Sequence, residues 1–270
     1  MISDSLKQQF KEQYNPEGSQ LRQIQLNLVG ILKEIDRVCR KNNITYWLDF
    51  GTLLGAVRHK GFVPWDDDLD IGIFKKDYKR LKKCLLKDLQ DPFVLRDYKM
   101  SKIHKLPILR VYNKHFLVAR KRTSNGEPIY ENAWVDVFPL VNGTLASKIF
   151  FEKSYGKYLR RTIHQIDDGV LNRIISYILK PIFRIMSVVV ILYCKIFISD
   201  SYVLDYGINF KPLRKKSEIL PLSTVEFEGV EFPAPANTDA YLQRFYGDYN
   251  QIPPEDKRVT HHFFDCKKLK

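Results

Sequence analysis

The sequence is poor in cysteine, and no cysteines are spaced as metal ligands or as a redox pair. Its 270 residues include four cysteines, and no Cys-x-x-Cys pair occurs. Cys266 alone has histidines nearby, at positions 261 and 262, and one cysteine with two histidines is too little for a structural zinc site without a remote ligand. We therefore expect four reduced thiols and a cytoplasmic protein.

A long hydrophobic run is also missing. Residues 1–13 are polar, so we expect no secretory signal there. Within the apolar segment 174–198, the longest uncharged stretch, Ile185 to Cys194, is shorter than the ~20 residues that cross a bilayer. Two interpretations of residues 170–200 remain open. They form a buried helix or helix pair, or an amphipathic helix that lies peripherally on the inner leaflet of the cytoplasmic membrane.

Acidic residues are outnumbered by basic ones. Lys and Arg total 44 against 31 Asp and Glu, which gives a net charge of +13. This surplus favours a polyanionic partner, such as nucleic acid, an acidic membrane or a phosphorylated glycan; an ordinary basic surface is the alternative. The basic residues are dispersed, and no aromatic RNP signature occurs, so we expect no nucleic-acid partner. The sequence is silent on the oligomeric state.

Hydrophobic periodicity predicts most of the secondary structure. Apolar residues from Leu21 to Val38 recur at helical spacing after Ser19, which we expect to cap a helix ending near residue 42. Residues 1–18 are polar and end in Asn15–Gly18, which we interpret as a loop leading to this helix. Further expected elements are strands at 44–50, 68–74 and 133–140, several short strands between 93 and 120, helices at 52–59 and 75–89, long helical structure at 145–200, a hairpin at 221–235, and a helix from Asn237 or Thr238 to Tyr246.

The strongest chemical signal is a run of aspartates after Trp65. Asp66, Asp67 and Asp68 are followed by Leu69 and Asp70. Side chains alternate in a strand, so Asp68 and Asp70 should share one face. Two such carboxylates repel each other unless a cation lies between them, and a divalent cation suits oxygen ligands. The alternative is an acidic loop in solvent, but the apolar residues behind the aspartates argue against it.

Asp136 is a candidate third ligand. It lies in the otherwise apolar segment Trp134–Pro139, where an unpaired carboxylate would be costly to bury. A neighbouring strand would bring it beside Asp68 and Asp70. The alternative for Asp136 is a salt bridge to Arg or Lys.

A glycine-led turn supplies a candidate anion cradle. Gly51 and Thr52 stand where a strand should turn into a helix, and a helix N-terminus offers free N–H groups to a phosphate. Arg58 and Lys60 add positive charge nearby, although simple surface charge is their alternative. Together with the aspartates, this turn predicts a site for phosphoryl chemistry.

These segments resemble the LicD family. The blocks that carry the resemblance are Gly51–Arg58, Gly61–Ile71, Trp134–Pro139 and Phe245–Tyr249. The resemblance implies a nucleotidyltransferase-like α/β (α+β) core with a small mixed sheet. We accordingly expect a polar segment at 1–19, the core at 20–143, a helical insertion at 144–215, and a C-terminal part at 216–270 that completes the site.

The resemblance also implies an activity. Family members move a phospho-head-group, phosphocholine by default, from a CDP-linked donor to a sugar hydroxyl of a glycan or lipid-linked glycan such as lipopolysaccharide, teichoic acid or capsule. The family pattern makes Asp68, Asp70 and Asp136 ligands of Mg²⁺ or Mn²⁺, with Asp66 as helper or base. The implied substrate contacts are Gly51, Thr52, Leu53, Arg58, Lys60, Trp65, Tyr246 and Asp248.

Other interpretations stay open. A nucleotidyltransferase of the same fold would move NMP to a small molecule or an RNA end, and a binding module for phosphorylated glycans would use the aspartates structurally. Trp65, Tyr246 and Tyr249 form either a cation–π box for a quaternary ammonium or ordinary core packing.

Overall fold

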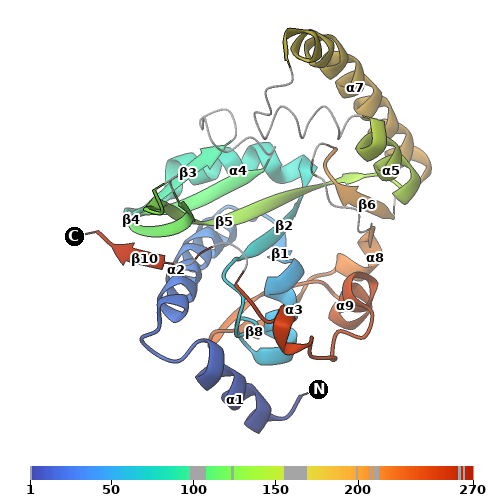
Figure 1. The fold of residues 1–270 in the computed structure, drawn as a ribbon. Helices are drawn as coiled ribbons and strands as arrows, with labels where there is room; N and C mark the ends of the chain where they lie inside the picture. Colours follow the sequence, from blue (N-terminus) through green and yellow to red (C-terminus); the bar gives the residue numbers. More distant parts are fainter. Residues whose placement is uncertain are drawn as a thin grey trace.

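The computed structural model describes residues 2–97, 108–122, 125–154, 169–198, 200–206, 208, 213–260, 263 and 265–269. A mixed eight-stranded sheet forms the centre of the molecule (Figure 1). Its main path runs β1 (Tyr46–Leu48), β2 (Asp70–Phe74), β5 (Pro128–Asn142), β4 (Leu109–Arg122) and β10 (Asp265–Lys268). Strand β3 (Phe93–Asp97) pairs with β4, while β6 (Ser201–Leu204) joins β5 to β7 (Arg214–Lys215).

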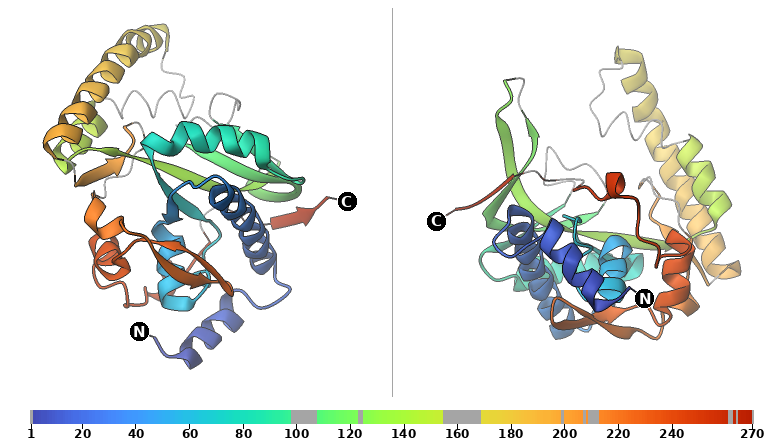
Figure 2. Two further views of the ribbon diagram at one scale, coloured as in Figure 1. Left: turned by 180° about the vertical axis from the view of Figure 1, so that it is seen from behind. Right: turned by 60° about the horizontal axis from the view of Figure 1, so that its bottom comes forward.

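Helices and one hairpin surround this sheet (Figures 1 and 2). They are α1 (Asp4–Tyr14), α2 (Gln20–Lys41), α3 (Phe50–His59), α4 (Lys75–Asp88), α5 (Leu145–Ser154), α7 (Gly169–Phe197), α8 (Lys216–Ile219), α9 (Thr238–Tyr246), the 3-10 turn η1 (Glu255–Lys257) and the hairpin β8 (Ser223–Phe227) and β9 (Val230–Ala234). The α2 helix packs against β4, β5 and β10, whereas α3 packs against β2, α9 and β8. The predicted α+β fold with a mixed sheet is therefore confirmed.

The expected long helix is confirmed together with its cap. The Ser19 hydroxyl accepts a hydrogen bond from the backbone N–H of Arg22 at 3.2 Å, which satisfies one free donor of the first turn of α2. Ile24, Leu28 and Ile31 are buried at helical spacing against the sheet. The α9 helix is capped by Asn237 and ends at Gly247, as its sequence predicts.

The structure adds one helix and corrects two expectations. The polar segment 4–14 forms helix α1, because Phe10 is buried against Trp65 and gives the segment an apolar anchor. Strand β2 begins at Asp70, so Asp68 precedes it. The several short strands expected between 93 and 120 are β3 and the single long β4 in the described residues, and residues 98–107 lie outside these.

The insertion also differs from expectation. Strands β6 and β7 lie within residues 144–215 but extend the main sheet. Helix α7 continues through Pro181. Its segment Tyr177–Phe197 is long and apolar enough to cross a membrane by length and composition, and it is the one such helix in the described part of the chain. It is mostly exposed, so the interpretation as a buried helix was wrong.

Candidate active site

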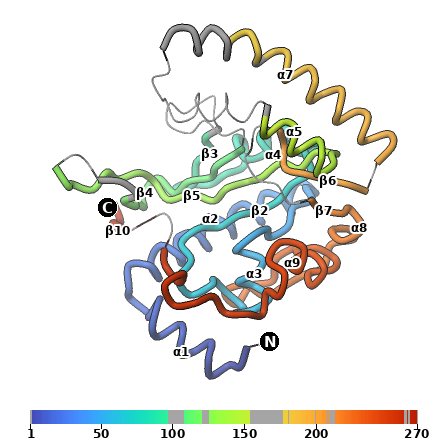
Figure 3. The backbone as a smooth tube through the Cα atoms, turned by 45° about the vertical axis from the view of Figure 1, so that its right-hand side comes forward, coloured from blue at the N-terminus to red at the C-terminus, as the bar shows by residue number. Residues whose placement is uncertain are grey.

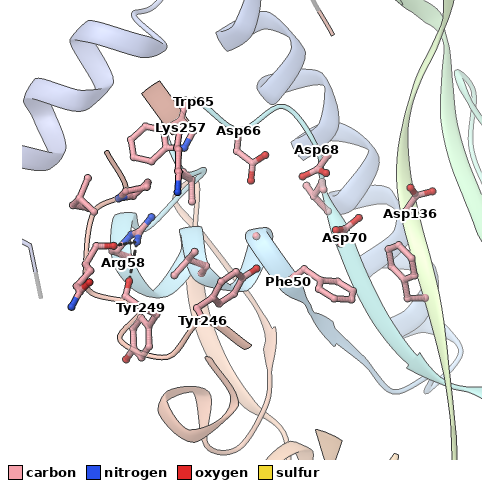
Figure 4. Close-up of a pocket in the computed structure, with 18 of the residues that line it drawn as sticks. Phe50, Arg58, Trp65, Asp66, Asp68, Asp70, Asp136, Tyr246, Tyr249 and Lys257 are labelled. Carbon is pink, nitrogen blue, oxygen red and sulfur yellow. Dashed lines mark hydrogen bonds between the residues drawn. The ribbon is translucent and has the colours of Figure 1, made fainter. Parts of the chain in front are cut away.

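A cavity of about 930 Å³ opens where β2, β5 and α3 meet the C-terminal part of the chain. Figure 4 shows Asp66, Asp68 and Asp70 reaching into it from one segment and Asp136 standing on the neighbouring strand. Residues 246–257 cover the other side. The C-terminal part therefore completes the cavity wall.

The parallel pairing of β2 and β5 brings two of the predicted carboxylates side by side. Asp70 and Asp136 are direct register partners, and the N–H of Asp136 donates to the carbonyl of Leu69 at 3.0 Å. Alternation places Asp66, Asp68 and Asp70 toward the cavity, while Asp67 and Leu69 are buried. The sequence thus predicts the shared face correctly, although Asp68 lies before the strand.

Asp67 has a different role from the other three aspartates. Its carboxylate is fully buried and accepts a hydrogen bond from the backbone N–H of Phe263 at 2.6 Å. Phe263 lines the cavity. Asp67 therefore fixes a distant C-terminal residue to the acidic segment.

The acidic cluster strongly disfavours its own ionisation. Burial raises the pKa of Asp70 well above its ordinary value, and the nearby charges of Asp68, Asp136, Asp49 and Asp66 raise it further. Burial also raises the pKa of Asp66, with Asp68 and Asp67 adding to the effect. All of these charged neighbours of Asp70 are carboxylates, so a cation in the cavity would relieve their repulsion.

Asp136 is held by Arg110. The guanidinium Nε of Arg110 lies 2.6 Å from Oδ1 of Asp136, and its Nη2 lies 3.3 Å from Oδ2. The indole N–H of Trp134 donates to the same Oδ2 at 3.2 Å, and Arg110 stacks on that indole ring. The salt-bridge alternative for Asp136 is thus what the structure contains. Among the described residues, no group of three or more Asp, Glu, His and Cys side chains is gathered closely enough to hold an ion as it stands.

The turn at Gly51 and Thr52 contacts two of the aspartates directly. A Cβ atom at Gly51 would lie 2.7 Å from Oδ2 of Asp66, so only glycine leaves room for that carboxylate against α3. Thr52 is buried, and its hydroxyl accepts a hydrogen bond from the N–H of Asp70 at 2.8 Å. Leu53 is fully buried in the core. Thr52 and Leu53 do not line the cavity, so the structure gives them positioning roles in place of the expected substrate contact.

A buried triad that the sequence analysis missed anchors the start of α3. Asp49 caps the helix by accepting from the N–H of Phe50 at 2.9 Å, and Arg214 lies 2.9 Å from its other carboxylate oxygen. The hydroxyl of Tyr241 donates to Asp49 at 2.8 Å and accepts from Arg214 at 2.7 Å. Phe50, which lines the cavity, has a left-handed backbone with φ of 47°. The hydrogen bonds of the triad hold the backbone at Phe50 in this rarely adopted conformation.

The two predicted basic residues are separated. Arg58 lines the cavity and donates to the carbonyl of Tyr249 at 2.8 Å. Burial lowers the pKa of Arg58 to about 10. Lys60 stands at the far end of α3, pairs with Glu226 at 3.4 Å and does not line the cavity, so its expected substrate contact is not supported. Lys257, which the sequence analysis missed, lines the cavity instead (Figure 4).

The predicted aromatic residues line one wall but do not form a free box. Trp65 packs edge-on against Phe10 and Tyr14 and lies under the guanidinium of Arg258. Tyr246 and Asp248 line the cavity. The Tyr249 hydroxyl donates to Asp239 at 2.8 Å. Trp65 is therefore largely occupied by core contacts.

The fold and the site together define a class of protein. A mixed sheet carries acidic residues on two adjacent parallel strands, and helix α3, with Gly51 in its first turn, faces them across a cavity. This is the arrangement expected of a nucleotidyltransferase-like protein.

Comparison with known proteins supports the resemblance of the motifs. Residues 43–164 match the family described as LicD/FKTN/FKRP, nucleotidyltransferase domain. The match confirms that this part of the chain resembles the LicD family. It is 27% identical over 264 residues to the lipopolysaccharide cholinephosphotransferase LicD of Haemophilus influenzae, a match that covers 90% of this chain and 96% of that protein.

More distant relatives match shorter segments. The human ribitol 5-phosphate transferase FKRP is 33% identical over 79 residues, which is 28% of this chain and 14% of that protein. The mouse ribitol-5-phosphate transferase FKTN is 47% identical over 36 residues, or 13% of this chain and 8% of that protein.

Proposed function

We propose that the protein is a phosphotransferase that moves a phospho-head-group from a CDP-linked donor to a sugar hydroxyl of a cell-surface glycan. Phosphocholine is the default head group, and lipopolysaccharide, teichoic acid or capsule is the acceptor class. The observation that carries the proposal is the register of β2 and β5, which places Asp70 beside Asp136 at a cavity. Similarity to the Haemophilus cholinephosphotransferase over 90% of this chain supports phosphocholine as the default head group.

The chemistry of the acidic cluster suits a divalent metal, although its carboxylates would have to draw together to hold one. Asp68, Asp70 and Asp136 would hold Mg²⁺ or Mn²⁺, because carboxylate oxygens suit both ions and the acidic neighbours of Asp70 favour a cation. When bound, the ion offsets the negative charge of the donor diphosphate. Because Asp136 is paired with Arg110, its use as a ligand requires that this salt bridge open.

The remaining cavity residues can bind and orient the donor. Arg58, Arg110 and Lys257 are cations on the cavity wall, and each can donate hydrogen bonds to phosphate oxygens. Asp66, seated beside Gly51, either supports the ligand aspartates or takes the proton of the attacking hydroxyl. Tyr246 and Asp248 line the part of the wall formed by the C-terminal region, where the head group or the nucleoside would lie.

Nucleotide release tests the proposal. The protein is incubated with CDP-choline, CDP-ethanolamine, CDP-ribitol or CDP-glycerol, with lipopolysaccharide as acceptor, and with Mg²⁺, Mn²⁺ or EDTA. We expect CMP release with at least one donor, abolished by EDTA. Release of pyrophosphate from a nucleoside triphosphate in place of CMP would identify a nucleotidyltransferase. Glycan binding with no turnover would identify a binding module.

A substitution at Gly51 tests whether the missing side chain there sets the position of the Asp66 carboxylate. In Gly51→Ala, the new methyl group would displace the Asp66 carboxylate, because the side-chain oxygen can move more easily than the backbone. We expect CMP release to fall by about 10²-fold, the scale on which small misplacements act. Stability should not fall, because alanine favours a helix over glycine by about 1 kcal/mol.

Gly30→Ala is the matched control. Gly30 lies on α2 and does not line the cavity. A Cβ atom there would meet only the ring of Phe93, at 4.0 Å. Equal turnover in both variants, measured beside their melting temperatures, would refute a role for Gly51 in placing Asp66.

A further inference from the structure

Helix α7 has two apolar faces, of which only one packs against other parts of the chain that the structure describes. Phe183 and Cys194 face α5 and the sheet: the ring of Phe183 lies 6.5 Å from that of Phe151, and Cys194 is 2% exposed. The opposite face is exposed, with Ile185 at 66%, Val189 at 60% and Ile196 at 70%. In Figures 1 and 3 this helix projects from the body of the molecule and runs alongside α5.

The exposed face is broad. Its residues are Ile178, Ile182, Ile185, Met186, Val188, Val189, Leu192, Tyr193, Ile196 and Phe197. At 100° per residue they cover about half of the helix circumference, which is wider than the narrow seam of a coiled coil. A soluble monomer seldom exposes a continuous apolar surface of this kind.

The charge of α7 points to the partner. The helix contains four basic residues and no acidic residue; the basic residues are Arg173, Lys180, Arg184 and Lys195. Arg184 and Lys195 are exposed and, at 100° per residue, both lie where the packed stripe borders the apolar face. An apolar face bordered along one edge by positive charge suits the headgroup region of an anionic bilayer, where basic side chains meet lipid phosphates.

We propose that α7 docks the protein peripherally on an anionic phospholipid surface, with its apolar face in the interfacial layer. The helix is packed along one side against the rest of the chain, so it would lie on the bilayer and would not cross it. The occupant of the exposed face is then lipid rather than a second copy of the chain.

The same docking would bring the cavity close to the membrane. The hydroxyl of Ser147 on α5 hydrogen-bonds Tyr206 at 2.8 Å, and the amine of Lys148 donates to the carbonyl of Ile208 at 2.7 Å. Ile208 lines the cavity. One wall of the cavity is thus fixed to α5, the helix against which α7 packs. A cavity held near the membrane would suit a lipid-linked acceptor, and this part alone rests on the proposed function.

Vesicle co-sedimentation of the full chain tests the docking. The vesicles contain phosphatidylcholine alone or mixed with phosphatidylglycerol. We expect sedimentation with the anionic vesicles, weaker sedimentation with the neutral ones, and release by alkaline carbonate. A variant combining Ile185→Glu, Val189→Glu and Ile196→Glu should lose at least about tenfold in bound fraction, because each glutamate would have to enter the apolar layer.

The matched control places three glutamates on other exposed apolar positions, as Leu26→Glu, Leu86→Glu and Ile129→Glu. It should bind vesicles as the wild type does. The proposal is overturned if the α7 variant sediments with anionic vesicles as strongly as the wild type does. It is also overturned if the wild type does not sediment with them at all. Resistance to carbonate would overturn it in favour of a spanning helix. A dimer in sedimentation velocity that the α7 variant dissociates, without vesicle binding, would overturn it in favour of self-association.

CMP release from a soluble donor separates this inference from the proposed function. None of the three substituted α7 residues lines the cavity, so turnover should be unchanged in the variant that no longer binds vesicles. Vesicle binding by a protein that turns over no CDP-linked donor would leave the docking intact and refute the enzymatic proposal alone.

Discussion

Replacing Asp70 by asparagine is expected to abolish CMP release while the protein stays folded. Asp70 stands at the centre of the acidic cluster, opposite Asp136 in the register of β2 and β5. Losing one carboxylate ligand removes several kcal/mol of transition-state stabilisation, which corresponds to a loss of about 10³-fold or more. The melting temperature should be unchanged or higher, because one of several mutually repelling carboxylates is gone.

Asp77→Asn provides the control for this experiment. Asp77 is a half-buried aspartate on α4 that does not line the cavity, so its amide variant should turn over like the wild type. CMP release is measured for both variants at saturating donor and metal. Near wild-type turnover of Asp70→Asn would show that the aspartates of the cavity are structural.

Replacing Arg214 by methionine is expected to produce the largest loss of stability. Arg214 and Asp49 are both fully buried and lie 2.9 Å apart. Removing the guanidinium leaves the Asp49 carboxylate as an uncompensated buried charge, at a cost of about 3–5 kcal/mol. Thermal unfolding should show a melting temperature lower by roughly 10 °C.

The double variant Arg214→Met with Asp49→Asn separates charge from packing. It removes both charges, so it should recover part of the stability lost in the single variant. Arg244→Met is the surface control, because Arg244 is exposed and pairs with Glu218 where solvent reaches the pair, and such pairs contribute about 1 kcal/mol. A loss in Arg214→Met no greater than in Arg244→Met would contradict the structural role given to the triad.

The local part of the site could be predicted from the sequence. The shared face of Asp68 and Asp70 follows from strand alternation, and the turn at Gly51 follows from the expected strand and helix around it. The pairing of the Asp136 strand with β2 is also confirmed; we expected it because an isolated carboxylate in an apolar strand is costly to bury. Short-range periodicity was therefore enough to predict the parts of the site whose geometry depends on residues close in sequence.

The partners that are distant in sequence could not be predicted. Arg110 reaches Asp136 through the antiparallel register of β4 and β5, and no single-sequence pattern fixes that register. Arg214 and Asp49 are 165 positions apart. Thr52 looked like a phosphate ligand, but the fold turns its hydroxyl to the backbone of Asp70. In each case the tertiary arrangement decides which of several polar partners a side chain meets.

Binding of Mn²⁺ followed by electron paramagnetic resonance, in the presence of CDP, measures most directly whether these carboxylates share an ion. For the wild type we expect saturable Mn²⁺ binding that Mg²⁺ displaces. Asp70→Asn and Asp136→Asn should each lose it, whereas Asp77→Asn should keep it. Saturable binding of equal affinity in all four proteins would contradict a metal site built from the two parallel strands.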